Sequence, residues 1–342
     1  MEIWLDAIAI VVLAILIDYF IGDVPNAIHP LRWMGNLLDI IDRHIKNRSS
    51  RWTSFLGFLS YLLVFFLFGG IAMLIIIAVH YLVSLYDPLW GEIAWIVVTA
   101  FIFKIQFAVF SFRHHCDPIC EDLDNGRVED AAAKVQMIVS RNTKGMDPEH
   151  IASSCCETVS ENLVDSVLSP TFFFGLLGIP GSIMFRCSNL MDAMWGYLND
   201  KYGRLGYFPA KFDDVLGWLT SRISPYFVAL AAMILKMDWR AAVPAAKAEH
   251  TKTPSPNSGW PMTAVSAALG ISMEKKGVYV MGTGPLPTTK DVKRCLRLVE
   301  LTSVLFIMTV CFLLFALIGI RVQLFIEWFL LSGWMDAIAL LC

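Results

Sequence analysis

Long apolar stretches separated by short polar segments dominate the two ends of the chain. Four of them approach the roughly 20 apolar residues that a helix needs to cross a bilayer core. They are residues 3–21, 55–82, 93–112 and 301–320. The first of them carries acidic residues near its start and lacks the basic region and cleavage site of a signal peptide. We therefore expect it to persist as a membrane span.

The middle of the chain is less regular. Residues 167–187 are apolar but interrupted by two prolines and several glycines, and residues 223–235 form a short apolar piece. Each is compatible with a re-entrant segment, a tilted short span or a buried core helix. Residues 322–341 contain two acidic and four aromatic side chains, which favours an interfacial or packed helix over a clean span. Since no run of alternating residues predicts strands, we expect an all-α, polytopic membrane fold with about four to six membrane helices.

Basic residues are distributed unequally between the segments that join these stretches. Five lie between the first two spans, whereas residues 84–92 contain none. The positive-inside rule places the first connection in the cytoplasm and the N-terminus outside. Residues 113–300 hold twenty more and return to the cytoplasm, provided that any spans hidden inside come as a pair. Of 27 Lys and Arg residues, 25 then share one side, leaving only Lys104 and Arg321.

These patterns predict three parts. Residues 1–112 form three N-terminal membrane helices with a short cytoplasmic loop. Residues 113–300 form a cytoplasmic-side catalytic region, and residues 301–342 form a C-terminal membrane helix with an amphipathic tail.

Composition agrees with a membrane location. The chain of 342 residues is 56% hydrophobic and only 17% charged, so a purely cytosolic protein is disfavoured. Its formal net charge is −3, and the scattered cations form no basic stripe for a nucleic acid. None of the eight cysteines forms a Cys-x-x-Cys pair, which favours free thiols over a disulfide or zinc framework.

An acidic stripe is the first candidate for chemistry. Asp147 and Pro148 predict a helix start, and Glu157, Glu161 and Asp165 then recur every four residues, with Asn162 beside them. In a regular helix these positions share one face, where like charges repel. A solvated acidic face is the alternative, but the neighbouring apolar positions imply a packed helix. We therefore interpret the stripe as a site for Mg²⁺ that carries substrate phosphates.

A basic turn precedes the stripe. Residues 140–145 read Ser-Arg-Asn-Thr-Lys-Gly, so that Arg141, Thr143 and Lys144 can present donors to a phosphate. Such a turn is otherwise an ordinary connection between helices. No Walker A sequence and no Gly-x-Gly-x-x-Gly fingerprint occur.

Three further polar sets complete the candidates. Arg186, Asn189 and Asp192 share one helical spacing and precede Asp213 and Asp214, although a structural ion pair would explain them equally. Two proline-rich loops are stiff and rich in donors, a composition more typical of binding elements than of spacers. The loop over residues 250–261 contains Ser255, Asn257 and Trp260, and the loop over residues 22–32 contains His29 and Arg32.

Taken in order, these motifs resemble the CobD/CbiB family of cobalamin biosynthesis. The resemblance runs from about residue 15 to about residue 300. It rests on Gly22-Asp23-x-Pro25, His29-Pro30-x-Arg32, Ser140-Arg141-Asn142-Thr143, Glu157-x-x-x-Glu161-Asn162-x-x-Asp165, Asn189-x-x-Asp192, Asp213-Asp214 and Ser255-Pro256-Asn257-Ser258-Gly259-Trp260-Pro261.

The resemblance implies a membrane ligase, adenosylcobinamide-phosphate synthase, which joins adenosylcobyric acid to an aminopropanol phosphate or a related amino-alcohol phosphate. It implies ATP and Mg²⁺ as cofactors, and membrane lipid and other late cobalamin-pathway enzymes as partners. Glu157, Glu161 and Asp165 would bind Mg²⁺ and act in catalysis, with Arg141, Lys144 and Arg186 on phosphate. The loop from Ser255 to Trp260 would hold the amino-alcohol phosphate or a corrin side chain. A non-enzymatic membrane sensor resembling AmpE, or a transporter, is the alternative.

Overall fold

The structure is a computed structural model that describes residues 3–45 and 52–341, with side chains except those of residues 26 and 333–341. The chain divides into two compact units. The first unit comprises Met1–Phe107, Ser169–Leu216 and Ile307–Cys342. The second unit comprises Ala108–Leu168 and Gly217–Phe306. Ser169–Leu216 groups with the first unit and not with the central region of the sequence.

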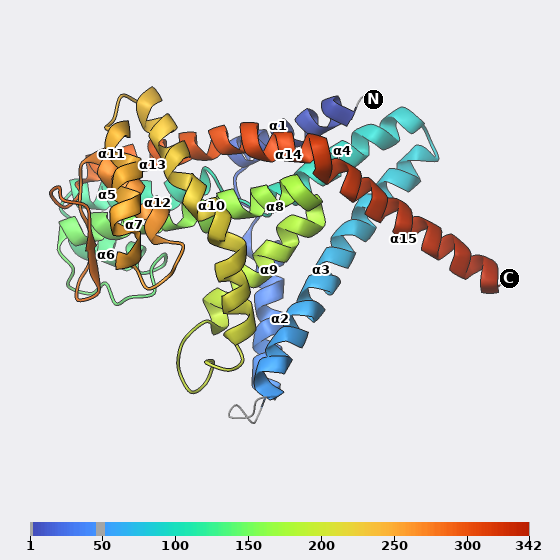
Figure 1. Ribbon diagram of the computed structural model, residues 1–342, viewed down its shortest axis with the longest axis horizontal. Coiled ribbons are helices and arrows are strands. Elements are labelled where there is room, and N and C mark those ends of the chain that lie inside the picture. The colour runs from blue at the N-terminus through green and yellow to red at the C-terminus, as the bar shows by residue number, and fades with distance from the viewer. Residues whose placement is uncertain (1–2, 46–51, 342) are drawn as a thin grey trace. The chain divides into compact units, whose positions relative to one another are not determined.

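Helices are the only regular secondary structure among the described residues of the first unit (Figure 1). Its elements are α1 (Ile3–Phe20), η1 (Asn26–Ile28), α2 (Pro30–His44), α3 (Trp52–Ser84), α4 (Pro88–Lys104), α8 (Ser169–Leu177), α9 (Ile179–Trp195), the start of α10 (Tyr207–Ile234), η4 (Ile307–Cys311), α14 (Phe312–Leu314), η5 (Phe315–Gly319) and α15 (Ile320–Leu341).

Three helical stretches among the described residues are long and apolar enough to cross a membrane, namely Ile3–Phe20, Trp52–Ser84 and Thr289–Ser332. They confirm three of the four predicted stretches. The bounds predicted for the remaining one, residues 93–112, are wrong, because α4 begins at Pro88 and ends at Lys104. Asp87 caps this helix by accepting hydrogen bonds from the backbone of Leu89 (2.9 Å) and Trp90 (3.1 Å), which fixes its start early.

The interrupted apolar stretch over residues 167–187 folds as parts of two helices packed against each other, α8 and α9. Gly178 separates them with a φ of 66°, a left-handed conformation that favours glycine. The backbone N–H of Ile179 is satisfied by Gln323 of α15 at 3.2 Å.

The start of the C-terminal tail is packed, one of the two arrangements expected for it. Glu327 is only 5% exposed and accepts hydrogen bonds from the indole of Trp95 (3.0 Å) and the amide of Gln323 (3.1 Å). These contacts supply the partners that a buried carboxylate requires. The same helix is apolar enough to continue the candidate span to Ser332.

The second unit surrounds α7 and carries one short β-hairpin. Its elements are α5 (Ser111–Asp124), α6 (Val128–Val135), α7 (Pro148–Leu163), the π-helical turn η2 (Val164–Leu168), the rest of α10, α11 (Trp239–Glu249), η3 (His250–Lys252), α12 (Gly259–Leu269), β1 (Met273–Lys275), β2 (Tyr279–Met281) and α13 (Thr289–Phe306). Apart from this hairpin, the described residues contain no strands, so the all-α expectation is confirmed.

Helix α7 lies at the centre of this unit, in contact with α13, α12, α6 and β1. Its side chains are therefore mostly buried, including Cys155 and Cys156. The seven cysteines in the described part of the chain are all buried, and none of them forms a disulfide.

Candidate functional site

A small polar cavity in the second unit brings together three segments that are distant in the sequence. Its volume is about 160 Å³. The turn before α7, one face of α7 and the β-hairpin form its walls. The lining residues are Ile138, Val139, Ser140, Arg141, Glu157, Thr158, Glu161, Asn162, Lys275 and Tyr279. Four of the predicted site residues thus share one cavity.

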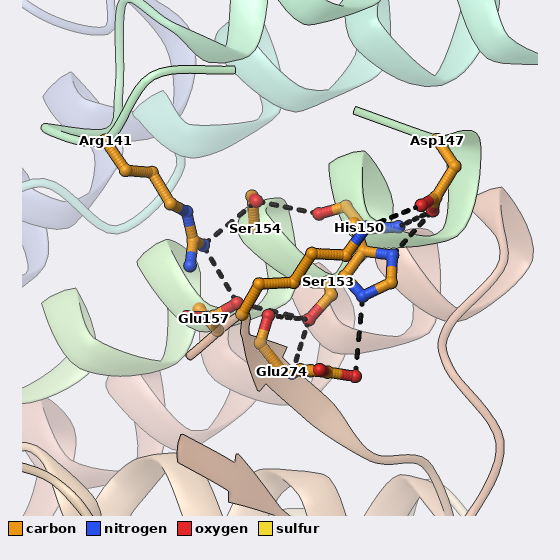
Figure 2. Close-up of polar contacts among 8 residues, drawn as sticks. Arg141, Asp147, His150, Ser153, Ser154, Glu157 and Glu274 are labelled. Carbon is orange, nitrogen blue, oxygen red and sulfur yellow. Dashed lines mark hydrogen bonds and ion pairs between the residues drawn. The ribbon is translucent and has the colours of Figure 1, made fainter. Parts of the chain in front are cut away.

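The N-terminus of α7 is fixed as its sequence predicts. Asp147 is the N-cap and accepts a hydrogen bond from the backbone N–H of His150 at 2.9 Å, with Pro148 in the first turn. The imidazole Nδ1 of His150 lies 2.6 Å from the same carboxylate oxygen (Figure 2). Against the opposing effect of burial, hydrogen bonds from His150 and Lys276 lower the pKa of Asp147. Asp147 therefore stays anionic and fixes the N-terminus of α7.

An ion pair connects the basic turn to the acidic face. Arg141 Nη2 lies 2.9 Å from Glu157 Oε1 and 2.9 Å from Ser154 Oγ (Figure 2). Glu157 is only 3% exposed and also accepts hydrogen bonds from Ser153 Oγ (3.1 Å) and Tyr279 Oη (2.9 Å). Every one of these partners donates to the carboxyl group of Glu157, which thereby positions Arg141.

The remaining donors of Arg141 make the cavity suitable for an anion. Its Nε and Nη1 atoms are buried and have no hydrogen-bond partner among the described residues. A guanidinium carries five N–H donors and loses stability when buried donors stay unpaired. Lys275, in β1, supplies a second cation to the same cavity. A phosphate group would satisfy both side chains.

Glu161 lines the cavity one helical turn beyond Glu157. Burial raises its pKa, and the negative charge of Glu157 raises it further, whereas Lys275 and Arg141 oppose the shift. Glu161 is therefore a carboxylate whose ionisation a bound cation would favour. Asn162 beside it accepts a hydrogen bond from Ser166 Oγ at 2.8 Å.

Asp165 does not continue the acidic stripe. The α-helix ends at Leu163, and Asp165 falls in the π-helical turn η2, whose wider coil breaks the four-residue periodicity. It is absent from the cavity lining. In the described part of the chain, no group of three or more His, Cys, Asp or Glu side chains is placed to hold a metal ion. The expected face of three aligned carboxylates therefore reduces to Glu157 and Glu161.

The other residues of the basic turn lie outside this cavity. Thr143 is buried, and its hydroxyl donates to the carbonyl of Ala132 at 2.7 Å, so its contacts fix the turn. Its backbone N–H donates to Gln136 Oε1 at 3.0 Å. Lys144 is exposed, and its backbone N–H donates to Asn142 Oδ1 at 3.0 Å.

The loop from Ser255 to Trp260 packs on α10 and on η3. Asn257 Oδ1 accepts hydrogen bonds from Ser221 Oγ (3.2 Å) and Arg222 Nη1 (3.3 Å), and Ser255 Oγ accepts from the backbone of Asn257 (3.2 Å). Trp260 stacks on His250 with ring centroids 4.0 Å apart. The close approach permitted by Gly259 is to the His250 carbonyl, where any Cβ would collide.

The first unit contains the remaining candidates. Arg186 Nη1 lies 3.4 Å from Asn189 Oδ1 on α9, whereas Asp214 on α10 pairs with Lys211 at 3.0 Å. Burial, together with the charge of Asp214, raises the pKa of Asp192. Asp213 is partly buried on α10.

The loop over residues 22–32 leads into α2, which begins at Pro30. His29 is the N-cap, with Nδ1 accepting a hydrogen bond from the backbone of Leu31 at 3.2 Å, and Arg32 is exposed. Burial lowers the pKa of His29. Three basic residues of the following connection, Lys46, Arg48 and Arg51, lie outside the described residues.

Sequence reasoning missed the β-hairpin and with it Lys275 and Tyr279. Strands of three residues are too short for an alternating pattern to be recognised. The only local signal was Gly277, which adopts a φ of 75° in the three-residue turn. Ser153 anchors the hairpin, since its hydroxyl accepts a hydrogen bond from the backbone of Glu274 at 2.8 Å.

The fold and the cavity together define an all-helical integral membrane protein with a cationic cavity beside two carboxylates. Comparison with known families identifies it further, because the model of the CobD/CbiB protein family matches residues 11–308. The chain belongs to this family.

Individual relatives agree. A probable cobalamin biosynthesis protein CobD of Methanothermobacter thermautotrophicus is 35% identical over 81% of this chain and 88% of its own length. The protein of the same name from Methanocaldococcus jannaschii is 32% identical over 87% of this chain and 95% of its own. The cobalamin biosynthesis protein CobD of Dehalococcoides mccartyi is 32% identical over 85% and 92%. No solved structure matches the chain.

Proposed function

We propose that this protein acts in cobalamin biosynthesis as an ATP-dependent ligase that joins adenosylcobyric acid to an amino-alcohol phosphate, giving adenosylcobinamide phosphate. Family membership supports the pathway. The observation that carries the reaction class is the pair of unpaired buried Arg141 donors beside Lys275 and Glu161 in one cavity. This combination suits a phosphoryl group more than a neutral ligand.

The chemistry requires such a cavity. A carboxylate is a poor acyl donor, so amide formation is expected to pass through an acyl phosphate made from the γ-phosphoryl group of ATP. The amine then attacks the acyl carbon, and inorganic phosphate leaves. Negative charge on the transferring group is stabilised by nearby cations. Arg141 and Lys275 would supply that charge, and Glu157 would keep Arg141 in place.

Mg²⁺ fits this arrangement through one or two carboxylates and not through three. In phosphoryl-transfer sites it usually keeps several waters and bridges a carboxylate to substrate phosphates. Glu161 is the side chain best placed to hold Mg²⁺, because Glu157 already accepts hydrogen bonds from Arg141, Ser153 and Tyr279. When bound, the ion would neutralise charge on the phosphates.

We assign the amino-alcohol phosphate, or a side chain of the corrin, to the loop that contains Ser255, Asn257 and Trp260. Trp260 has a buried indole Nε1 without a partner among the described residues, which a substrate oxygen could satisfy. Arg186, Asn189, Asp192, Asp213, Asp214, His29 and Arg32 stay as proposed contacts for the corrinoid or the phosphates, as do Thr143 and Lys144 of the basic turn. Other late-pathway enzymes stay as proposed partners.

Purified protein in detergent tests the reaction. We expect release of ADP and formation of an amide only when ATP, Mg²⁺, a corrinoid acid and an amine phosphate are all present. ADP release at the same rate without the corrinoid acid and the amine phosphate would contradict the ligase activity. Absence of turnover from a folded protein that binds the corrinoid would instead favour a sensor or transporter.

We also propose that the second unit faces the cytoplasm. The proposal rests on the 25 basic residues that the positive-inside rule assigns to one side. A reporter fused after Lys252 should be cytoplasmic, and one at Tyr86 external. Finding both on the same side would overturn this topology.

A further inference from the structure

The first unit contains a second cavity, much larger and almost wholly apolar. Its volume is about 390 Å³, within the range of small-molecule sites. Segments from α2, α3, α4 and α9 line it. The lining residues are Val24, Ile28, Pro30, Trp33, Met34, Phe68, Ile71, Ala72, Ile75, Val98, Phe101, Ile102, Ile105, Gln106 and Ile183.

Gln106 is the only side chain in this lining whose polar end is an amide. It is 3% exposed, and its Nε2 donates to the carbonyl of Ile102 at 3.2 Å. Its Oε1 has no hydrogen-bond partner among the described residues. A buried acceptor without a donor destabilises the structure, because it has lost the hydrogen bonds that water would make to it. A water molecule would need two to four polar partners, which these walls do not offer.

The cavity is continuous with the membrane-facing surface of α3. Leu63, Leu67, Ile71 and Ile75 recur every four residues along this candidate span and are 53%, 42%, 47% and 45% exposed. The last two also line the cavity. Apolar side chains exposed on a spanning helix face acyl chains, so the cavity opens to lipid.

The polar acceptor lies at one end of this apolar path. Gln106 follows Lys104, the last residue of α4, which pairs with Asp18 at 3.1 Å and marks a charged level. Val98, on the apolar part of the wall, precedes Lys104 by about 9 Å of helix. A molecule with an apolar tail and a donor at one end would match this polarity.

We propose that this cavity binds a membrane lipid, with its tail along α3 and α4 and a hydroxyl at its polar end donating to Gln106 Oε1. The ligand class is a long-chain alcohol or a lipid that carries a free hydroxyl. A chain of this kind removes the apolar walls from solvent and satisfies the buried acceptor.

Photolabelling in vesicles of phosphatidylethanolamine and phosphatidylglycerol tests the site without any turnover. The probe is hexadecanol bearing a diazirine on its chain, compared with its methyl ether, which has the same tail but no donor. With the wild-type protein we expect labelled peptides from residues 68–75 and 98–106, and at least fivefold more labelling by the alcohol than by the ether. Equal labelling by the two probes, or labelling spread evenly along α3, would overturn the proposal.

Two variants sharpen the result. Ala72→Trp fills the cavity and should lower labelling by at least tenfold, whereas Ala78→Trp makes the same change at an exposed position of α3 outside the lining and should leave it unchanged. Gln106→Leu should remove the preference for the alcohol while the ether still labels. Equal labelling of the two tryptophan variants would contradict the site. If Ala72→Trp fails to fold, the comparison of the two probes on the wild-type protein still decides.

Discussion

Two paired cations, one in each unit, show how the same kind of charge can have opposite uses. Lys104 is 1% exposed, and its ammonium pairs with Asp18 at 3.1 Å and Asp23 at 2.5 Å. Arg141 pairs with Glu157 through Nη2 alone, while Nε and Nη1 stay unpartnered beside a cavity. In the first cluster two carboxylates pair with the same ammonium, and these pairs join the ends of α1 and α4. In the second, two nitrogen atoms of Arg141 have no hydrogen-bond partner among the described residues, which is the property expected of a binding site.

The largest effect should come from breaking the ion pairs of Lys104 with Asp18 and Asp23. Lys104→Met removes the cationic partner of Asp18, a side chain that is only 1% exposed. Leaving a buried charge uncompensated costs about 3–5 kcal/mol, so the variant should unfold at much lower temperature or denaturant in detergent. The double variant Lys104→Met with Asp18→Asn should recover part of the loss. Unchanged stability of the single variant would show that this pair is not structural.

Removing Arg141 should affect turnover more than folding. Arg141→Ala should lower kcat and raise the KM for ATP, with kcat/KM reduced about 100-fold, or about 2.7 kcal/mol. Arg127→Ala is the matched control, because Arg127 also pairs with a carboxylate, Asp122 at 2.6 Å, but lies outside the cavity. Steady-state kinetics on both variants test the contrast. Equal losses would mean that Arg141 is merely another ion-pair residue.

The two assigned substrate regions can be separated in the same experiment. Asn257→Ala should chiefly raise the KM for the amine phosphate and leave the ATP dependence little changed, because uniform binding is lost. Arg141 responding to the amine phosphate and Asn257 to ATP would require the two assignments to be exchanged.

Glu161→Gln keeps the size of the side chain but removes the charge that a cation needs. We expect turnover to fall at least tenfold, about 1.4 kcal/mol, with a weakened dependence on Mg²⁺. Titration of activity with Mg²⁺ gives the measurement. Normal kinetics with unchanged Mg²⁺ dependence would show that Glu161 is only part of a polar wall.

The raised pKa of Glu161 adds a pH test. Burial, reinforced by Glu157, favours the protonated form in the folded protein. Its contribution to stability is therefore present at low pH and is lost as pH rises through the folded-state pKa. Activity should change in the opposite direction, increasing as the carboxylate forms, with an acid limb above the usual range for glutamate. The limb should disappear in Glu161→Gln, and its persistence there would assign it to another group.

The smallest effect is expected at the hairpin. Tyr279→Phe removes one donor from Glu157, which keeps Arg141 and Ser153 as partners. A hydrogen bond of this kind contributes about 0.5–1.5 kcal/mol, so kcat/KM should fall about twofold to tenfold. A loss as large as that of Arg141→Ala would indicate that the phenol itself contacts substrate.

The features that depend on local periodicity could be predicted from the sequence. The long apolar stretches appear as α1, α3 and the helix over Thr289–Ser332. Asp147 and Pro148 start α7 as capping chemistry requires. The four-residue spacing placed Glu157 and Glu161 on one face, and the short connection from Arg141 allowed its side chain to reach Glu157.

The side chains that complete the cavity are brought together by tertiary packing. Lys275 and Tyr279 come from a hairpin more than a hundred residues beyond α7, held there by Ser153 and Glu157. The π-helical turn takes Asp165 out of the stripe, because a change in helical pitch has no reliable signature in residue spacing. Side-chain pairing across long sequence separations depends on packing between elements, and a local pattern carries no information about which element will supply the partner.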